Sequence, residues 1–377
     1  MIYFDYNATT PVLPAARDAW LRASEEFFGN PSSPHRLGSR AEAALDNARQ
    51  KLSRILECDP LDIVWTSGTT ESNNTVLHHV AQELKMDEEV WVSAIEHPCV
   101  IAPAQRSLGP RLRLIPASKS GVVDLDWLTG ELEKRRPRLL AVMAANNETG
   151  ALQPWPKILE LCHRANLEFF CDAAQWIGKM PSSGIGAADW VSGCAHKFGG
   201  PKGVGFLKCP RHKLTAPLIL GGEQEDGRRS GTENVPGVVA MVAALEESES
   251  MLRARTHQDR LHARDNFERD LCDRLPGCEI IAADAPRLWN TSAVLMPQVN
   301  CQQRWVVKLD KAGFAVSTGS ACASGKEKPS HVLNAMGFAP EDGSRMLRFS
   351  TGWGTQESDW RELLKAILEI SREMTPR

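Results

Sequence analysis

The segment S-G-C-A-H-K-F-G-G-P-K-G, residues 192–203, places Lys197 in a turn of small residues. Upstream, the mostly apolar run 167–171 predicts a buried strand, which is followed by Asp172 and Gln175. A lysine in such a turn can form a Schiff base with an aldehyde cofactor, and an acid that follows a strand can pair with the pyridinium nitrogen of that cofactor. A surface lysine in an ordinary turn is the alternative, and this segment alone leaves both open.

The overall composition is that of an ordinary globular protein. The chain has 377 residues, of which 42% are hydrophobic and 24% charged, so it is long enough for two domains. The net charge of -3, without a large basic block, argues against nucleic acid as the main partner. No apolar run is long enough to cross a bilayer, and residues 1–5 show no signal-peptide pattern. We therefore expect a cytoplasmic protein without a membrane segment or a direct nucleic-acid partner.

The cysteines divide into a scattered majority and one exception. There are 10 of them without a C-x-x-C pair, so neither a zinc site nor any other metal site is indicated. In a reducing compartment most should be small buried apolar residues. Cys322 differs, because it lies among small residues in S-T-G-S-A-C-A-S-G (317–325) and close to Lys326 and Lys328. Such a segment predicts a mobile, exposed loop and a reactive thiol. A buried cysteine in a turn is the alternative.

Strand and helix patterns alternate from about residue 63 to residue 208, and polar residues cluster where the predicted strands end. This order predicts an α/β fold with a mainly parallel, helix-covered sheet. One long helix is expected over about 236–275 as a bridge to a smaller α+β domain. The predicted large domain spans 13–255. The predicted small domain combines 1–12 with 256–377 and carries the Cys322 loop at about 316–328.

Polar groups at three places suggest ligand sites. Residues 66–74, T-S-G-T-T-E-S-N-N, lie between a short strand and an apolar helix expected over about 75–84, and such a junction binds anions through backbone N–H groups. A plain helix cap is the alternative there. His97 follows a predicted strand, at the edge where open α/β sheets bind ligands, although a lone histidine is more often structural. Arg348 is a candidate carboxylate clamp, with a surface salt bridge as the alternative.

Together these segments make the chain resemble a cysteine desulfurase of the NifS/IscS type, in the class V aminotransferase branch of the fold-type I pyridoxal-phosphate (PLP) enzymes. The resemblance covers almost the whole chain and implies a mainly parallel, seven-stranded-type sheet, bound pyridoxal 5′-phosphate and a homodimer. It rests on motifs that occur in the following order: F-D-Y-N-A-T-T-P (4–11), G-N-P-S-S-P-H (29–35), T-S-G-T-T-E-S-N-N (66–74), E-H-P (96–98), N-N-E-T-G (146–150), D-A-A-Q (172–175), A-H-K-F-G-G-P-K-G (195–203), R-S-G-T-E-N (229–234), S-T-G-S-A-C-A-S-G (317–325) and R-F-S (348–350).

The resemblance also implies roles for residues around the cofactor ring. Lys197 matches the lysine that binds the cofactor covalently, and Asp172 matches the partner of the pyridinium nitrogen. His97 matches the histidine that stacks on the ring. Asn147 and Gln175 match the residues that hold the phenolic oxygen of the cofactor and help to place the substrate.

Further roles concern the phosphate, the substrate and the sulfur. Thr70 and His196 match phosphate ligands, and Thr232 matches a phosphate ligand that the family supplies from the neighbouring subunit. Arg348 matches the arginine that binds the substrate carboxylate. Cys322 matches the nucleophile that accepts sulfur.

Two features depart from the family pattern. The family has a serine three residues before the cofactor lysine, whereas this chain has Cys194, and a thiol is a poor hydrogen-bond donor. We therefore expect the phosphate to be held less tightly, or through water or Thr69. The chain also stops soon after its last predicted helix, so the longer tail with which some relatives dock an iron–sulfur scaffold looks trimmed.

The reaction implied by the resemblance converts L-cysteine to L-alanine and leaves the sulfur on Cys322 as a persulfide. The sulfur would then pass to an acceptor, such as an iron–sulfur cluster assembly scaffold, a tRNA- or DNA-thiolation enzyme or a cofactor pathway. The alternatives are a selenocysteine lyase, a class V aminotransferase or, less favoured, a non-catalytic sulfur carrier or scaffold. The loop around Cys322 resembles the long mobile type rather than the short loop of selenocysteine lyases, and an aminotransferase needs no nucleophilic cysteine.

Overall fold

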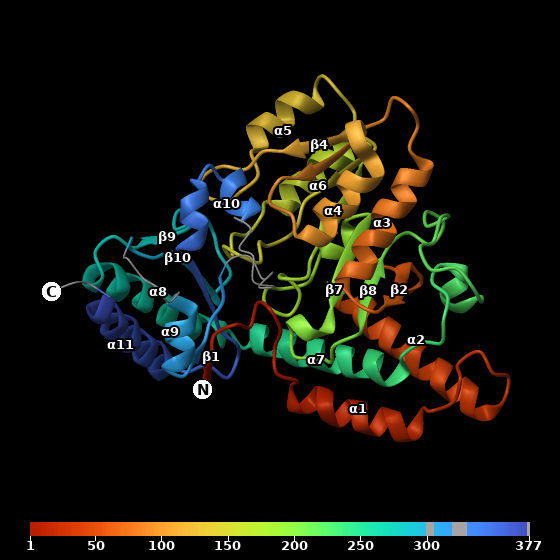
Figure 1. Cartoon of the computed structure of the whole chain (residues 1–377). Helices are drawn as coiled ribbons and strands as arrows, with labels where there is room; N and C mark the ends of the chain where they lie inside the picture. The colour runs from red at the N-terminus through yellow and green to blue at the C-terminus, as the bar shows by residue number, and fades with distance from the viewer. Residues whose placement is uncertain (299–304, 319–329, 375–377) are drawn as a thin grey trace.

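A seven-stranded sheet forms the centre of the larger part of the molecule (Figure 1). The computed structural model describes residues 1–298, 305–318 and 330–374. All neighbouring strands of this sheet are parallel except where β8 takes part, because β8 is antiparallel to both β2 and β7. The predicted α/β class with a mainly parallel sheet is therefore confirmed. Across the sheet the strands are β2 (Ile63–Thr66), β8 (Gly205–Lys208), β7 (Trp190–Cys194), β6 (Glu168–Asp172), β5 (Leu139–Ala141), β3 (Val90–Ser93) and β4 (Leu112–Ile115).

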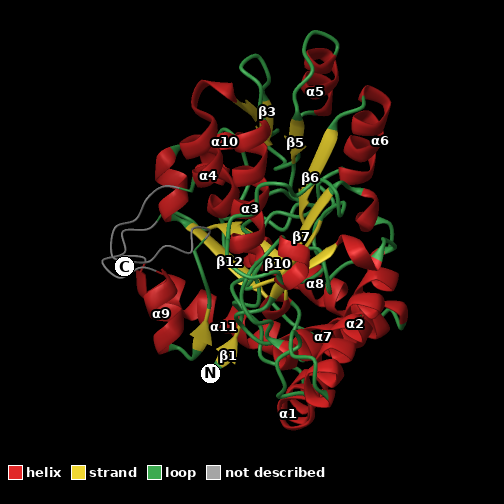
Figure 2. Ribbon diagram, turned by 90° about the vertical axis from the view of Figure 1, so that its right-hand side faces the viewer, coloured by secondary structure: helices red, strands yellow, loops and turns green. Residues whose placement is uncertain are grey.

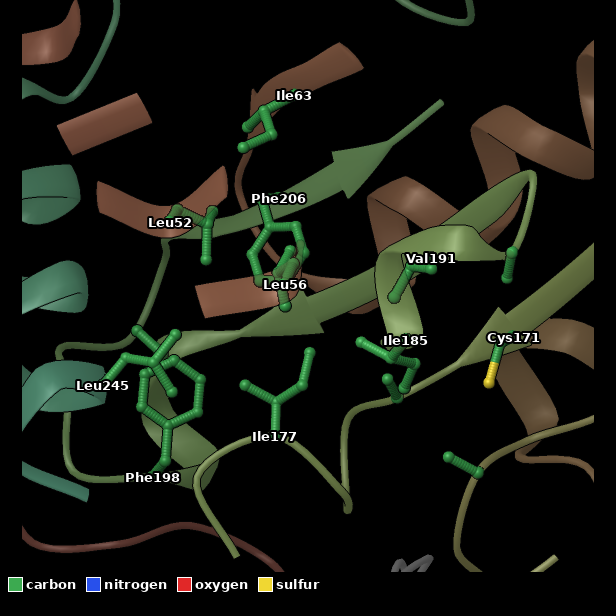
Figure 3. Close-up of a cluster of buried hydrophobic side chains, with 14 of the residues drawn as sticks. Leu52, Leu56, Ile63, Cys171, Ile177, Ile185, Val191, Phe198, Phe206 and Leu245 are labelled. Carbon is green, nitrogen blue, oxygen red and sulfur yellow. The ribbon is translucent and has the colours of Figure 1, made fainter. Parts of the chain in front are cut away.

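Helices cover both faces of this sheet, as Figure 2 shows for α3 and α4 on one side of β6 and α6 on the other. Successive strand residues face opposite sides, so Phe169 and Cys171 join the apolar cluster under α2, α6 and α7, while Phe170 joins the cluster under α3 and α4. Figure 3 shows part of the first cluster. The helices of this part are α1 (Pro14–Glu26), α2 (Arg36–Leu56), α3 (Thr69–Glu83), α4 (Pro98–Leu108), α5 (Leu125–Leu132), α6 (Trp155–Ala165) and α7 (Val235–Arg253).

A smaller sheet lies beside the large one, with β10 (Thr291–Leu295) between β9 (Glu279–Ile280) and β12 (Met346–Ser350), all antiparallel. The N-terminal strand β1 (Ile2–Tyr3) pairs in parallel with β11 (Phe314–Ala315). Phe4 accordingly belongs to the apolar cluster of this part and packs edge-on against Trp360, with ring centroids 4.9 Å apart. The helices here are α8 (His257–Arg274), α9 (Trp305–Lys311), α10 (His331–Ala335) and α11 (Glu357–Met374).

The single long helix predicted over 236–275 is wrong, because two helices occupy that range. α7 ends at Arg253 and α8 begins at His257, and Arg255 between them has a left-handed backbone with φ of +57°. The two helices pack in different apolar clusters, α7 under the large sheet and α8 beside the small one. The break lets each helix lie along its own sheet.

Helix α3 begins earlier than the sequence predicts, at Thr69 instead of about residue 75. Its N-cap is Gly68, whose φ of +153° is one that a residue with a side chain rarely adopts. Thr69 and Thr70 therefore stand in the first turn of the helix, where backbone N–H groups have no partner within the helix. Within the described ranges, the helices are all too short or too polar to span a bilayer.

Candidate active site

One cavity of about 500 Å³ opens where the parallel strands of the large sheet end. Nearly all the predicted cofactor residues line it, and only Thr232 does not. Those that line it are Thr69, Thr70, His97, Asn147, Asp172, Gln175, Cys194, His196 and Lys197.

The sheet brings these side chains together because each follows a strand at the same edge. Asp172 is the last residue of β6, and Cys194 is the last residue of β7. His97 follows β3 and caps α4, and Lys197 lies in the short 3₁₀ turn that follows β7. Residues more than 70 positions apart in the chain thus face one cavity.

Asp172 is held as a fixed carboxylate. Its Oδ2 accepts a hydrogen bond of 2.8 Å from Nδ2 of Asn73, and its Oδ1 accepts one of 2.9 Å from the backbone N–H of Ala174. Both donors fix the orientation of the carboxyl group. Asp172 can therefore keep a proton on a ring nitrogen that is placed against it.

Lys197 points its amine at the N-terminal segment. Its Nζ donates to the carbonyl oxygens of Asn7 at 2.6 Å and Ala8 at 2.8 Å. Burial lowers the pKa of Lys197, and the nearby positive charge of Arg348 acts in the same direction. A larger fraction of this amine is therefore neutral than for an exposed lysine, and only the neutral amine can attack an aldehyde.

His97 is held in one tautomer by its own helix. Its Nδ1 accepts the backbone N–H of Cys99 at 3.2 Å and lies 2.9 Å from Sγ of the same residue. Burial lowers the pKa of His97, with the carboxylate of Asp172 acting against this shift and the positive charge of Lys197 adding to it. The ring is thus neutral with its proton on Nε2, which leaves an N–H free to act in the cavity.

The start of α3 forms an anion cradle in the lining of the same cavity. Thr69 and Thr70 supply hydroxyls and backbone N–H groups at the positive end of the helix dipole. His196 lines the same cavity, and burial together with Lys197 lowers its pKa to about 4, so its ring is neutral. Lys202 adds a positive charge to the same lining.

Arg348 lies behind the cavity rather than on its surface. Its Nη2 forms an ion pair of 2.6 Å with Oδ1 of Asp5, and its Nη1 donates to the carbonyl oxygen of Asn147 at 2.9 Å. The side chain is only 1% exposed. The role in binding a substrate carboxylate stays a prediction, and it would require the substrate to replace or share the partner Asp5.

Two further predicted residues are not among those that the structure shows lining the cavity. Cys322 and most of its loop fall outside the described residues. Thr232 is described and is exposed, away from the cavity lining. Its role as a phosphate ligand for a neighbouring subunit stays a prediction.

Several residues of the site were not assigned a role from the sequence. Asn7 and Asn73 fall inside the quoted motifs, but the sequence does not show which residues they contact. Cys99 and Lys202 also line the cavity, and Lys179 lies directly behind it with a hydrogen bond to Gln175.

A buried lysine with a lowered pKa, a fixed carboxylate and an anion cradle around one cavity define an enzyme that uses pyridoxal 5′-phosphate. The family model "Aminotransferase class-V" matches residues 2–363, and the chain belongs to this PLP-dependent family. Among curated relatives, a cysteine desulfurase of Klebsiella pneumoniae is 36% identical over all of this chain and 94% of its own length.

Solved structures agree with this placement. A NifS-like protein superposes with a TM-score of 0.88 and 32% identity over 99% of both chains. A structure described as SspA in complex with cysteine has a TM-score of 0.79 and 29% identity, over 93% of this chain and 98% of that one. The chain is therefore similar to cysteine desulfurases over its full length.

The residues present fit the cofactor. Its phosphate suits the cradle at the start of α3, and its ring nitrogen suits the carboxylate of Asp172. In addition, Oδ1 of Asn147 is buried and has no hydrogen-bond partner among the described residues, so a polar group of a ligand can use it. PLP would be held by Lys197, Asp172 and the cradle.

Replacing Cys194 by serine is expected to tighten PLP binding. Cys194 lines the cavity beside Thr69, and burial raises the pKa of its thiol, so it offers at best a weak S–H donor to an anion. In Cys194→Ser the hydroxyl would donate fully, and the dissociation constant of PLP should fall about tenfold. Titration of the apoenzyme with PLP, followed by absorbance, measures it.

Cys162→Ser serves as the matched control, because Cys162 is buried in the apolar cluster under the large sheet. That variant should lose stability without any change in PLP affinity. An unchanged or weaker PLP affinity in Cys194→Ser would contradict the assignment of residue 194 to the phosphate.

Proposed function

We propose that this chain is a PLP-dependent cysteine desulfurase that converts L-cysteine to L-alanine and transfers the sulfur to Cys322. The observation that carries the proposal is the cavity that brings Lys197, Asp172 and His97 together. The names of the relatives, which are similar over the full length, supply the reaction.

When bound, PLP supplies an electron sink that weakens the bonds at the substrate α-carbon. The amine of Lys197 removes the proton from that carbon and returns it later. Asp172 keeps the ring nitrogen protonated. The Nε2–H of His97 exchanges a proton with the substrate thiol.

The sulfur transfer balances without an external oxidant or reductant. The Cys322 thiolate attacks the substrate sulfur, so an S–S bond forms while the bond between carbon and sulfur breaks. The electrons of that bond remain with the carbon skeleton, which is protonated and leaves as alanine. The products are a Cys322 persulfide and L-alanine.

An assay without any keto acid separates this proposal from its rivals. The purified protein with L-cysteine and a thiol reductant should yield equal amounts of alanine and sulfide. An aminotransferase would need a keto acid, and a selenocysteine lyase would turn over selenocysteine but not cysteine. A non-catalytic sulfur carrier would be colourless and inactive.

We also propose a homodimer in which Thr232 reaches the cavity of the partner subunit, supported by its exposure outside its own cavity. Lys197→Ala and Thr232→Ala are each expected to be severely impaired. When the two are mixed and allowed to exchange subunits, a hybrid dimer has one site with both residues intact. Activity should then return to about a quarter of the wild-type value.

The same mixture tests the alternative arrangement. If Thr232 served its own subunit, no site in the hybrid would contain both residues and no activity would return. Sedimentation of the wild-type protein alone checks that it forms a dimer.

Three further proposals concern the domain boundaries, the cellular location and the sulfur acceptor. We propose the division into a large domain, 13–255, and a small domain formed by 1–12 and 256–377, supported by the separate apolar clusters of the two parts. We further propose a cytoplasmic enzyme whose sulfur acceptor is a protein, either an iron–sulfur scaffold or a thiolation enzyme. Trapping the persulfidated enzyme with proteins of its own cell identifies which.

A further inference from the structure

Lys179 is a buried lysine that the proposed reaction does not use. Its side chain is 4% exposed, and no ion pair joins it to a carboxylate within the described part of the chain. Instead, its Nζ donates to Oδ1 of Asn7 at 2.9 Å and to Oε1 of Gln175. Burying a charged amine without a carboxylate partner costs folding free energy. The two contacts to amide oxygens therefore indicate what the amine does at this position.

The amine needs no charge to make both contacts. Burial lowers the pKa of Lys179 far below that of an exposed lysine, and the nearby Lys197 and Arg348 lower it further, with Cys194 acting weakly against them. A neutral amine still has two N–H groups, one for each amide oxygen. Lys179 can therefore serve both oxygens at neutral pH without a buried charge.

The orientation of the Gln175 amide follows from its other partner. Its nitrogen, Nε2, lies 2.9 Å from the carbonyl oxygen of Asn7. A carbonyl only accepts, so the amide nitrogen must face Asn7 and the amide oxygen must face Lys179. The second proton on Nε2 is then left over, and Gln175 lines the cavity.

Asn7 fixes the arrangement from the other end. Its Nδ2 donates to Oγ1 of Thr291 at 2.9 Å and to the carbonyl oxygen of Asn147 at 3.3 Å, so its Oδ1 faces two donors, Lys179 and Nδ2 of Asn290 at 3.1 Å. Neither amide can flip without losing a donor. Lys179 therefore joins two side-chain amides whose orientations are both determined.

We propose that Lys179 is a positioning residue that holds the amide oxygen of Gln175 away from the cavity, so that an N–H faces the ring oxygen of the cofactor. This inference rests on the proposed role of Gln175 in the site. Without Lys179, Oε1 of Gln175 would lose the one donor that the described residues give it, and only the contact from Nε2 to the Asn7 carbonyl would still hold the amide. The amide would then be free to turn and place Oε1 in the cavity.

The effect appears in the spectrum of the bound cofactor, independently of turnover. An N–H donor stabilises negative charge on the ring oxygen and so keeps the form with fewer protons accessible at lower pH. In Lys179→Met the donor is lost, and the pH at which the visible band titrates should rise by about one unit. Gln175→Ala should produce a rise of similar size.

Lys208→Met is the matched control. Lys208 is also buried, at 5% exposure, its Nζ donates to the carbonyl oxygen of Ala188 at 2.8 Å, and neither residue lines the cavity. Its replacement should lower thermal stability as the loss of any buried lysine would, but leave the titration of the band unchanged. A shift in this control equal to that in Lys179→Met would overturn the inference.

The double variant gives the decisive comparison. If Lys179 acts through Gln175, adding Lys179→Met to Gln175→Ala causes no further shift. A full additional shift overturns the inference, as does a normal titration in Lys179→Met alone. If Gln175→Ala itself titrates normally, the role of Gln175 in the site fails and the inference fails with it.

Should Lys179→Met fold poorly, Lys179→Gln provides the second measurement. A glutamine amide can still donate to Oε1 of Gln175, so this variant should bind PLP and show a shift smaller than that of Gln175→Ala. A shift as large as that of Gln175→Ala would overturn the inference, because a donor at position 179 would then have no influence on Gln175.

Discussion

Cys322→Ala is expected to bind the cofactor normally and to react with L-cysteine, yet to form no persulfide. Lys197, Asp172 and His97 line the cavity independently of residue 322, so the cofactor and the substrate should still be bound. Only the nucleophile that takes the sulfur is missing, and sulfide release should fall by about 10³-fold. Mass spectrometry of the protein after exposure to cysteine detects the persulfide, and absorbance detects the bound cofactor.

Cys272→Ala is the matched control for this experiment. Cys272 is an exposed cysteine on α8 and does not line the cavity. That variant should form the persulfide and release sulfide like the wild type. Normal sulfide release from Cys322→Ala would show that another group accepts the sulfur.

Lys197→Ala is expected to abolish both the characteristic visible absorbance and the activity. The amine of Lys197 lines the cavity where the aldehyde of the cofactor would bind. Its lowered pKa makes it a better nucleophile than an exposed lysine amine. The same amine moves the proton at the substrate α-carbon, so turnover should fall by about 10⁴-fold or more. The absorption spectrum and an alanine assay measure the two effects separately.

Lys202→Ala controls for the loss of a positive charge in the same cavity. It should weaken PLP binding but retain the visible band once PLP is saturating. If Lys197→Ala kept the band, the assignment of the covalent link to Lys197 would be wrong.

The sequence predicted the fold and most of the cavity because the evidence is local. Strands such as Ile63–Thr66 are short apolar runs followed by polar residues, and parallel strands bring their carboxyl ends to one edge. Asp172, His97 and Lys197 each follow such a run. The order of the elements placed them at one edge of the sheet, and the resemblance to the family assigned them to one cofactor.

What the sequence did not predict depends on contacts between distant segments. The break at Arg255 carries neither glycine nor proline, so only the separate packing of α7 and α8 reveals it. Nothing in the sequence distinguishes Lys179 from a surface lysine, because its two amide partners lie 4 and 172 positions away in the chain. The early start of α3 likewise depends on the backbone of Gly68, whose φ of +153° is not visible in the sequence pattern.

The carbonyl of Asn7 holds the amine of Lys197, while the backbone N–H and the side chain of the same residue are bound by Ser350 and Thr291 of the small sheet. The first residues of a chain are usually the part that tolerates tags, trimming and sequence drift best. In this enzyme, by contrast, Asn7 connects the candidate cofactor lysine to the small sheet. Substitutions are therefore expected to be tolerated better on the exposed faces of the helices than at Asn7.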